Sequence, residues 1–320
     1  MSASGGTKAI LAAFLANTGI AVTKFIAWLV SGSASMLAEA VHSVADAGNQ
    51  LLLFFGGRQA KRRADRAHPF GYGRERYVYA FVVSIILFSV GGLFSIYEGV
   101  DKLQHPHALE NAWVPIVVLV IAIVLESFSL RTAVKESNQV RGKQGWVQFV
   151  RHAKAPELPV VLLEDVAALL GLVFALFGVG LTIITGNTIF DAIGTLMIGT
   201  LLIIIAIILG IETKSLLVGE GANEADLEKI QSAILSGPEA ERIIHMKTLY
   251  LGPDELLVAA KLGFQPHESL AEVSTAINVI EQRVREVVPS ARVIYLEPDI
   301  YVDPNEQAPP TDAIVIKGLE

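Results

Sequence analysis

Long apolar stretches alternate with short polar segments through the first two thirds of the chain. A helix needs roughly 20 residues to cross a hydrocarbon core about 30 Å thick. Six stretches reach about that length: Ile10–Val30, Ala34–Gly56, Tyr77–Val100, Trp113–Val134, Leu158–Ile184 and Ile189–Ile211. The pattern predicts an α-helical membrane protein in which residues 1–213 form six transmembrane helices.

After Lys214 the spacing of apolar residues changes to that of a small soluble domain. In chain order, the pattern predicts a helix over 224–235, strands over 243–251 and 256–264, a helix over 270–288 and a strand over 292–296. The order αββαβ indicates a ferredoxin-like α+β domain over residues 214–302, expected in the cytoplasm. The last segment, 303–320, contains three prolines and is expected to be a flexible tail.

The composition supports a membrane protein with one acidic soluble domain. Hydrophobic residues make up 52% of the chain and charged residues only 18%, against roughly 25% charged in average globular proteins. The net charge is −7, and residues 214–320 hold 18 acidic and 9 basic side chains, so residues 1–213 carry a net +2. This balance argues against a nucleic-acid partner. The absence of cysteine excludes disulfides, iron–sulfur clusters and cysteine zinc sites.

Basic residues in the loops between the spans set the expected orientation. The loops after the second and fourth spans contain many Lys and Arg residues, whereas the intervening loops offer only Lys102. Positively charged loops stay on the cytoplasmic side. Both termini are therefore expected in the cytoplasm, with the protein in the plasma or inner membrane. The first span has no small-residue cleavage site, so no removable signal peptide is expected.

Ionisable residues lie inside two of the predicted spans, where insertion costs at least about 2.5 kcal/mol for each charge. In the second span, spacings of three and four place four polar residues on one helical face: Glu39, His42, Asp46 and Asn49. The fifth span contains Glu164 and Asp165. At 1.5 Å per residue along two antiparallel helices, Asp46 and Asp165 fall near one depth, slightly inside the membrane centre. Acidic groups that meet there repel unless a cation lies between them.

An imidazole with carboxylates is a donor set suited to Zn²⁺, and also to Mn²⁺, Fe²⁺ or Co²⁺. His42 and Asp46 lie one helical turn apart, so both side chains can reach one ion. The alternative is an interhelical hydrogen-bond network or a proton relay without metal. The shared depth and the opposed acidic pair favour the metal.

Three other polar residues in the spans have simpler interpretations. Lys24, in the last third of the first span, is expected to extend its ammonium group outward to the membrane surface. Asp191 begins the sixth span and is expected to be its N-cap. Glu126 is either a member of a proton path or one partner in a structural pair.

The loop before the third span contains Asp65, followed by His68 in the sequence His-Pro-Phe-Gly-Tyr-Gly. Asp65 and His68 either hold a peripheral metal ion or cap a turn that leads into the third helix. With six spans, His-x-x-x-Asp in the second span and the αββαβ domain, the chain resembles the cation diffusion facilitators from Thr7 to about Val302. It looks most like the zinc-transporter branch that carries Glu-Ala-Val-His-Ser-Val-Ala-Asp together with Leu-Leu-Glu-Asp.

The resemblance implies a homodimer in membrane lipid that exports divalent metal from the cytosol in exchange for protons. The metal is then the transported substrate, and no permanently bound cofactor is implied. The family's transport site falls on His42 and Asp46 in the second span and on Asp165 in the fifth. The family ligand position four residues before that aspartate holds a valine here. Glu164, Asn49 or water is therefore expected to complete the coordination.

The family's other metal positions match only in part. In the loop, Asp65 and His68 match, but Tyr72 stands where many relatives have a histidine, so a weakened or absent loop site is expected. In the soluble domain, His245 matches a common ligand position, whereas Lys261 and a leucine replace two others. A surface polar residue is the favoured interpretation of His245, with a metal ligand as the alternative.

The predicted function is therefore zinc efflux by a secondary active transporter, not an enzyme, through proton antiport and alternating access around a site near the membrane centre. Within transport, the alternative is an exporter of Mn²⁺, Fe²⁺ or Co²⁺ that uses the same residues. An intramembrane metal-dependent hydrolase would need an activating base beside an open metal position, and the sequence has no HExxH motif. A membrane-tethered interaction protein would leave the buried carboxylates unexplained.

Overall fold

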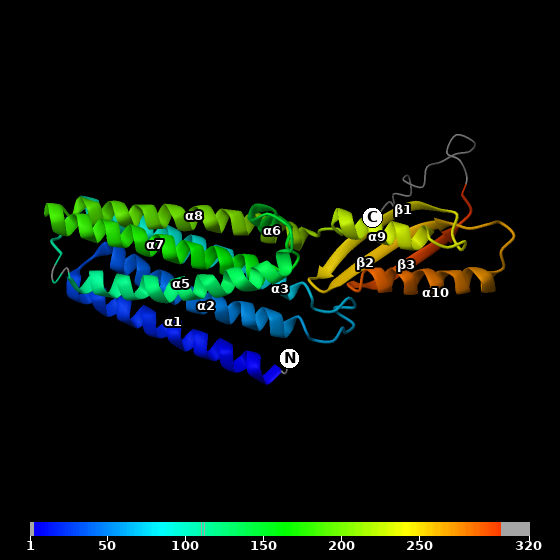
Figure 1. Cartoon of the computed structure of the whole chain (residues 1–320), viewed down its shortest axis with the longest axis horizontal. Helices are drawn as coiled ribbons and strands as arrows, with labels where there is room; N and C mark the ends of the chain where they lie inside the picture. Colours follow the sequence, from blue (N-terminus) through cyan, green and yellow to red (C-terminus); the bar gives the residue numbers. More distant parts are fainter. Residues whose placement is uncertain (1–2, 110, 112, 302–320) are drawn as a thin grey trace, which may run out of the picture. The chain divides into compact units, whose positions relative to one another are not determined.

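The computed structural model describes residues 3–109, 111 and 113–301. The tail predicted over 303–320 lies outside these residues. The chain forms two compact units, Met1–Val218 and Gly219–Glu320, and Figure 1 labels most of the helices and strands of each.

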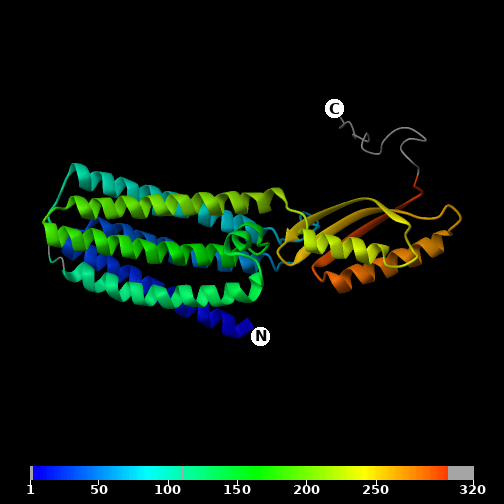
Figure 2. The ribbon, with the colours of Figure 1, turned by 45° about the horizontal axis from the view of Figure 1, so that its top comes forward.

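The first unit is a bundle of long helices (Figures 1 and 2). In chain order they are α1 (Ala3–Ser31), α2 (Ala34–Gln59), α3 (Glu75–Ile86), the π-helical segment η1 (Leu87–Leu93), α4 (Phe94–Gln104), α5 (Trp113–Arg141), α6 (Trp146–His152), α7 (Glu157–Thr185) and α8 (Ile189–Val218). Segments α3, η1 and α4 follow one another without a break and correspond to the third predicted span. Helix α8 continues to Val218, beyond residue 213, where the sequence placed the end of the membrane domain.

Several helices of the bundle are suited to a membrane. Within the described residues, four are long and apolar enough to cross one: Glu75–Gln104, Trp113–Arg141, Glu157–Thr185 and Ile189–Val218. Helix α2 is also long, at 26 residues, but Glu39, His42 and Asp46 lower its hydropathy. Two of these residues, His42 and Asp46, are predicted ligands of the metal site.

The outside of the bundle is apolar, as contact with lipid requires. Val117, Val120, Val124 and Phe128 of α5 are all exposed. Glu39 of α2 and Glu164 and Asp165 of α7 are buried instead, as is usual for ionisable residues within membrane spans. The first unit is therefore a membrane domain with a polar interior.

The third span and α8 approach each other to backbone contact. A Cβ atom at Gly199 of α8 would lie 2.8 Å from the backbone nitrogen of Ile96, so a larger residue does not fit there. The π-helical segment η1 precedes this contact, and π-helical turns are frequent at functional sites. A Cβ atom at Gly91 of η1 would lie 3.9 Å from Nδ1 of His42. Segment η1 therefore borders the predicted site.

The second unit is a two-layer α+β domain. Its elements are α9 (Glu224–Leu235), β1 (Arg242–Gly252), β2 (Glu255–Gly263), α10 (Leu270–Val287) and β3 (Ala291–Asp299). The sheet has the order β1-β2-β3. Strands β1 and β2 pair antiparallel, with Thr248 opposite Val258, and β2 and β3 pair parallel, with Ala260 opposite Leu296. The predicted fold class, a helical membrane domain followed by an α+β domain, is confirmed.

The helices of this domain begin at capping residues that the sequence supplies. The Asn223 side chain accepts a hydrogen bond from the N–H of Asp226 at the start of α9. Ser269 and Glu272 form a capping box at the start of α10. Both helices bury one apolar face, and Ile230 and Ile280 are fully buried in the core. Helix α10 provides the crossover that two parallel strands need.

Candidate metal site

Helix α2 carries the predicted site, and its first turn is held by α8. The sequence predicts Asp191 as the N-cap of α8, and this is wrong. Helix α8 begins at Ile189, so Asp191 already lies within its first turn, and its carboxylate accepts a hydrogen bond from the N–H of Ala34 on α2 at 2.8 Å. Asp191 therefore caps the neighbouring helix.

His42 and Asp46 are brought together on the buried face of α2. Nε2 of His42 lies 3.4 Å from Oδ2 of Asp46, and the imidazole is almost completely buried. Among the described residues, neither ring nitrogen of His42 has a hydrogen-bond partner, and Oδ1 of Asp46 has none either. Buried polar atoms without partners are rare in proteins. The pair thus presents unshared nitrogen and oxygen lone pairs inside an apolar bundle.

The two acids of α7 point to different helices. Oε1 of Glu164 accepts a hydrogen bond from Nδ2 of Asn49 on α2 at 2.7 Å. Oδ2 of Asp165 accepts one from the Ser129 hydroxyl on α5 at 3.0 Å. Oδ1 of Asn49 is buried and has no hydrogen-bond partner among the side chains that the structure describes. Consecutive residues of a helix differ by about 100° in direction, so Glu164 faces α2 while Asp165 faces α5.

The predicted ligands therefore do not surround one point. Within the part of the chain that the structure describes, no three His, Cys, Asp or Glu side chains are close enough to hold one metal ion. His42 and Asp46 form a pair on α2, whereas Glu164 and Asp165 each have a neutral hydrogen-bond partner. A shared ion requires the α7 acids to exchange those partners.

Several acidic side chains lie near one another in this region. Glu39, Glu126 and Glu164 are within electrostatic range of Asp46, as is the Lys24 ammonium group, and Glu126 is also within range of Asp165. Like charges in a low-dielectric interior repel strongly. The arrangement therefore favours a bound cation.

Lys24 does not extend to the membrane surface, and the sequence prediction for it is wrong. Its side chain is fully buried, with Nζ 2.9 Å from Oε2 of Glu39. Nζ also donates a hydrogen bond to the Ser43 hydroxyl at 2.8 Å. The ion pair with Glu39 inside the bundle stabilises the ammonium group more than extension of the side chain to the membrane surface would.

The depth of the two residues could have predicted this pair. Lys24 lies seven residues before the end of α1 at Ser31, and Glu39 lies five residues after the start of α2 at Ala34. Both side chains are therefore roughly 8–10 Å from the turn that joins the helices. Opposite charges at one depth in adjacent antiparallel helices indicate a pair.

The Asp65 carboxylate in the loop before α3 closes a turn. Its Oδ1 accepts hydrogen bonds from the N–H groups of Ala67 and His68 at 3.0 and 2.8 Å. Its Oδ2 accepts one from the Tyr72 hydroxyl at 2.6 Å, and this bond lowers the pKa of Asp65. Nδ1 of His68 lies 3.5 Å from Oδ1. These contacts are those of the capped turn: Oδ1 accepts the backbone hydrogen bonds and Oδ2 accepts the hydrogen bond from Tyr72.

In the second unit, a lysine stands beside the predicted ligand. His245 of β1 is exposed and pairs in register with Lys261 of β2. Nζ of Lys261 lies 2.8 Å from Oδ2 of Asp299 and 3.3 Å from Oε1 of Glu297. Hydrogen bonding to Asp299 raises the pKa of Lys261, and the same bond lowers the pKa of Asp299. The Lys261 ammonium group thus pairs with the two carboxylates that would otherwise be available to a metal ion.

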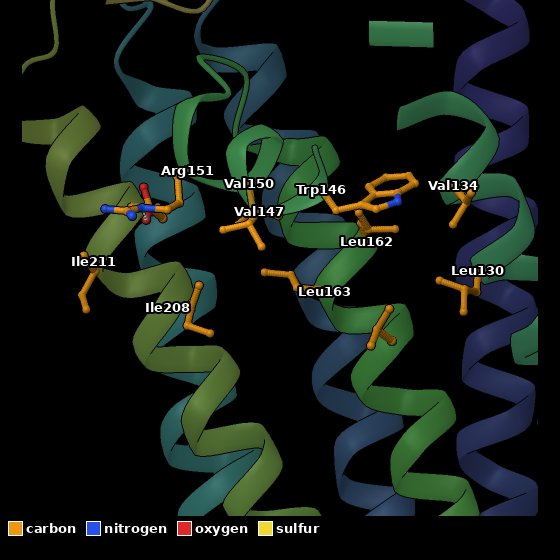
Figure 3. A pocket seen from close by; sticks show the side chains of 12 residues that line it. Leu130, Val134, Trp146, Val147, Val150, Arg151, Leu162, Leu163, Ile208 and Ile211 are labelled. Atoms are coloured by element: carbon orange, nitrogen blue, oxygen red, sulfur yellow. Dashed lines mark ion pairs between the residues drawn. The ribbon is translucent and has the colours of Figure 1, made fainter. Parts of the chain in front are cut away.

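A cavity of about 680 Å³ lies between α5, α6, α7 and α8. In Figure 3, Leu162 and Leu163 of α7 and Ile208 of α8 face it. Arg151 and Glu212 are the charged residues of its lining, and their side chains lie 3.7 Å apart. Because the remaining lining is largely apolar, the cavity offers no set of cation ligands.

Comparison with known proteins decides the family. Residues 10–218, well over half of the chain, match the family model of the cation efflux transmembrane domain. The chain belongs to the cation diffusion facilitator family.

Relatives within the cation diffusion facilitator family come from animals, plants and bacteria. The mitochondrial proton-coupled zinc antiporter SLC30A9 of Xenopus laevis is 32% identical over 82% of this chain and 48% of its own length. Metal tolerance protein C4 of Arabidopsis thaliana is 29% identical over 80% of this chain and 57% of its own length. The cation-efflux pump FieF of Klebsiella pneumoniae is 24% identical over 95% of this chain and 94% of its own length. The chain spans about half the length of the animal and plant relatives.

Proposed function

We propose that the chain exports divalent metal cations, Zn²⁺ first among them, across a membrane in exchange for protons. The observation that carries the proposal is the pair of His42 and Asp46 in the bundle, whose ring nitrogens and Oδ1 have no hydrogen-bond partner in the part of the chain that the structure describes. This pair lies on the polar helix of a bundle from the cation diffusion facilitator family. The relatives named as a zinc antiporter and a cation-efflux pump support the same activity.

The chemistry follows from competition for lone pairs. Facing the cytosol, neutral His42 and ionised Asp46 bind the ion, and Asp165 replaces its bond to Ser129 with a bond to the metal. Glu164 or Asn49 completes the coordination. Facing outside, protons bind the same donor atoms and expel the ion, because metal binding and ligand protonation exclude each other. Imidazole ordinarily titrates near neutral pH, which makes His42 the natural proton carrier.

The orientation and assembly belong to the same proposal. The basic loops lie in the cytoplasm, as do both termini, and the protein is a homodimer in a plasma or inner membrane. Export then runs from the cytosol outward. The loop residues Asp65 and His68 act as a structural turn, and the hydrogen bonds at Asp65 support this role. His245 has a surface role beside Lys261.

Proteoliposomes with a pH gradient test the proposal. Zn²⁺ flux is measured for the unaltered protein and for H42A, D46A and D165A, each of which is expected to lose flux at least about a hundredfold. H105A is the matched control, because His105 is an exposed histidine bonded to Asp101, and its flux is expected to be unchanged. Flux retained in both H42A and D46A would contradict the site.

Manganese is the second candidate substrate. Asp46, Glu164, Asp165 and the Asn49 amide make the region rich in oxygen donors, and oxygen donors suit Mn²⁺. Competition decides between the ions: flux of Zn²⁺ is measured with Mn²⁺, Fe²⁺ or Co²⁺ added in excess. A substrate that competes at equal concentration shares the site, whereas an ion that fails to compete in excess is excluded.

A further inference from the structure

The ion pair of Lys24 and Glu39 has no role in the function proposed above. Both side chains are fully buried, with 2.9 Å between Nζ and Oε2. Burying two charges costs several kcal/mol for each ion, and the attraction between them repays this cost only in part. A pair of this kind is therefore weak evidence for a purely stabilising role.

The pair lies beside the proposed site. Glu39, His42, Ser43 and Asp46 follow one another at spacings of three, one and three, so they occupy one side of α2. The Lys24 ammonium contacts Glu39 and Ser43, within one helical turn of His42. The ammonium group is also within electrostatic range of His42 and Asp46.

The second oxygen of Glu39 is unused. Oε1 is buried and has no hydrogen-bond partner within residues 17–109, 111 and 113–301, and it lies against Gly171 of α7, where a Cβ atom would come within 2.6 Å of it. The carboxylate is thus a potential oxygen ligand one turn from His42. Its other oxygen, Oε2, accepts the hydrogen bond from the Lys24 ammonium.

The number of carboxylates near the proposed site affects how tightly it would hold an ion. The acids near the proposed site are Glu39, Asp46, Glu126, Glu164 and Asp165. A divalent ion among so many negative charges would bind tightly and leave slowly. Transported ions need binding that is favourable enough to enter and weak enough to leave.

We propose that Lys24 is a positioning residue that keeps Glu39 out of the metal coordination and lowers the affinity of the site so that the ion can leave. This inference rests on the proposed function. The ammonium group acts in two ways: it occupies Oε2 of Glu39, and it places a fixed positive charge near the ion. A fixed positive charge beside the site repels a divalent ion and so lowers the affinity of the site for it.

The test compares K24M, E39Q and the double variant K24M/E39Q with the unaltered protein. Zn²⁺ affinity is measured by titration calorimetry in detergent, and kcat and KM are measured by flux into proteoliposomes. K24M is expected to bind Zn²⁺ at least about fivefold more tightly, with lower KM and lower kcat. E39Q is expected to bind it at least about fivefold more weakly, because it leaves the cation without its anion. The double variant is expected to bind within about threefold of the unaltered protein.

A purely structural contact between α1 and α2 gives a different pattern. Both single variants break the same contact, so both would change the affinity in the same direction, and that result would overturn the proposal. If K24M does not fold, E39Q and the double variant decide the question. If the charge of Lys24 lowers the affinity of the site, the double variant binds Zn²⁺ more tightly than E39Q does. Equal Zn²⁺ affinities for these two variants would overturn the proposal. If the unaltered protein neither binds nor transports Zn²⁺, the proposed function fails instead.

Discussion

Oδ1 of Asp191 on α8 accepts a hydrogen bond from the hydroxyl of Ser33, the residue that caps the start of α2, at 2.8 Å. The same carboxylate accepts bonds from the N–H groups of Ala34 at 2.8 Å and Ser35 at 3.3 Å. The first N–H groups of a helix have no partner within it. The negative charge also faces the positive end of the α2 dipole. One helix of the bundle thus fixes where another begins.

Replacing Asp191 with alanine is expected to lower the free energy of unfolding by about 2–3 kcal/mol, because the substitution leaves buried N–H groups unpaired. D191N retains one carbonyl acceptor and is expected to lose less. Thermal unfolding in detergent micelles measures both effects. D101N is the control, because Asp101 is about half exposed and its loss is expected to have little effect. Equal melting temperatures for D191A and the unaltered protein would show that α8 does not cap α2.

Replacing Gly171 with alanine tests the close approach of α7 to Glu39. The added Cβ atom would come within 2.6 Å of Oε1, so the carboxylate or the helix must shift. Overpacking of this kind costs about 1–3 kcal/mol, and Zn²⁺ flux is expected to fall several-fold. G180A on the same helix is the matched control, since nothing lies within 4 Å of a Cβ atom there. If flux falls by the same amount in G180A, the change in helix propensity from glycine to alanine, and not the contact with Glu39, causes the effect in G171A.

Periodicity and spacing predicted which residues lie on the buried face of α2 but not how the neighbouring helices are rotated. His42 and Asp46 belong to one helix, and a separation of four residues was enough to predict their contact. The bond from Ser129 to Asp165 joins two helices. Its formation depends on the rotation of α5 about its axis, which a nearly uniform apolar sequence does not specify. The pattern of α5 thus identified a span and not its inward face.

The soluble domain was easier to predict for a physical reason. Its strands and helices alternate between buried and exposed positions, and caps such as Asn223 and Ser269 mark where the helices begin. In the membrane domain, lipid and core are both apolar, so alternation is lost. The prediction for Lys24 was wrong for this reason. It took the membrane surface as the nearest polar environment and did not consider Glu39 on the neighbouring helix.

Replacing Ser129 with alanine is expected to raise the affinity for Zn²⁺. The hydroxyl and the metal compete for Asp165, and a hydrogen bond to a charged group is worth about 1.5–3 kcal/mol. The dissociation constant is therefore expected to fall by roughly tenfold, as measured by titration calorimetry. S127A is the control, because its hydroxyl bonds to the carbonyl of Ile123 on the same helix. Weaker binding in S129A would mean that the hydroxyl orients Asp165 for the metal.

The contact between Lys261 and Asp299 is expected to give the soluble domain a stability that depends on pH. The hydrogen bond from Lys261 lowers the pKa of Asp299 below its ordinary value of 3.8. A lowered carboxyl pKa stabilises the folded state above the unfolded pKa, and this contribution is lost as the pH falls through the folded pKa. The pKa of Lys261 is raised above 10.5 by the bond to Asp299, so the contribution is also lost as the pH rises through that raised value.

K261M isolates this effect. The difference in unfolding free energy between K261M and the unaltered protein is expected to be constant near neutral pH and to shrink at both extremes. The pKa of Asp299, followed by carboxyl NMR, is expected to return toward its ordinary value in K261M. K247M is the matched control, since Lys247 is an exposed lysine of β1, and its substitution is expected to leave that pKa unchanged. An unchanged pKa in K261M would show that the ammonium group does not hold Asp299 in solution, and the carboxylates of β3 would then be available to a cation.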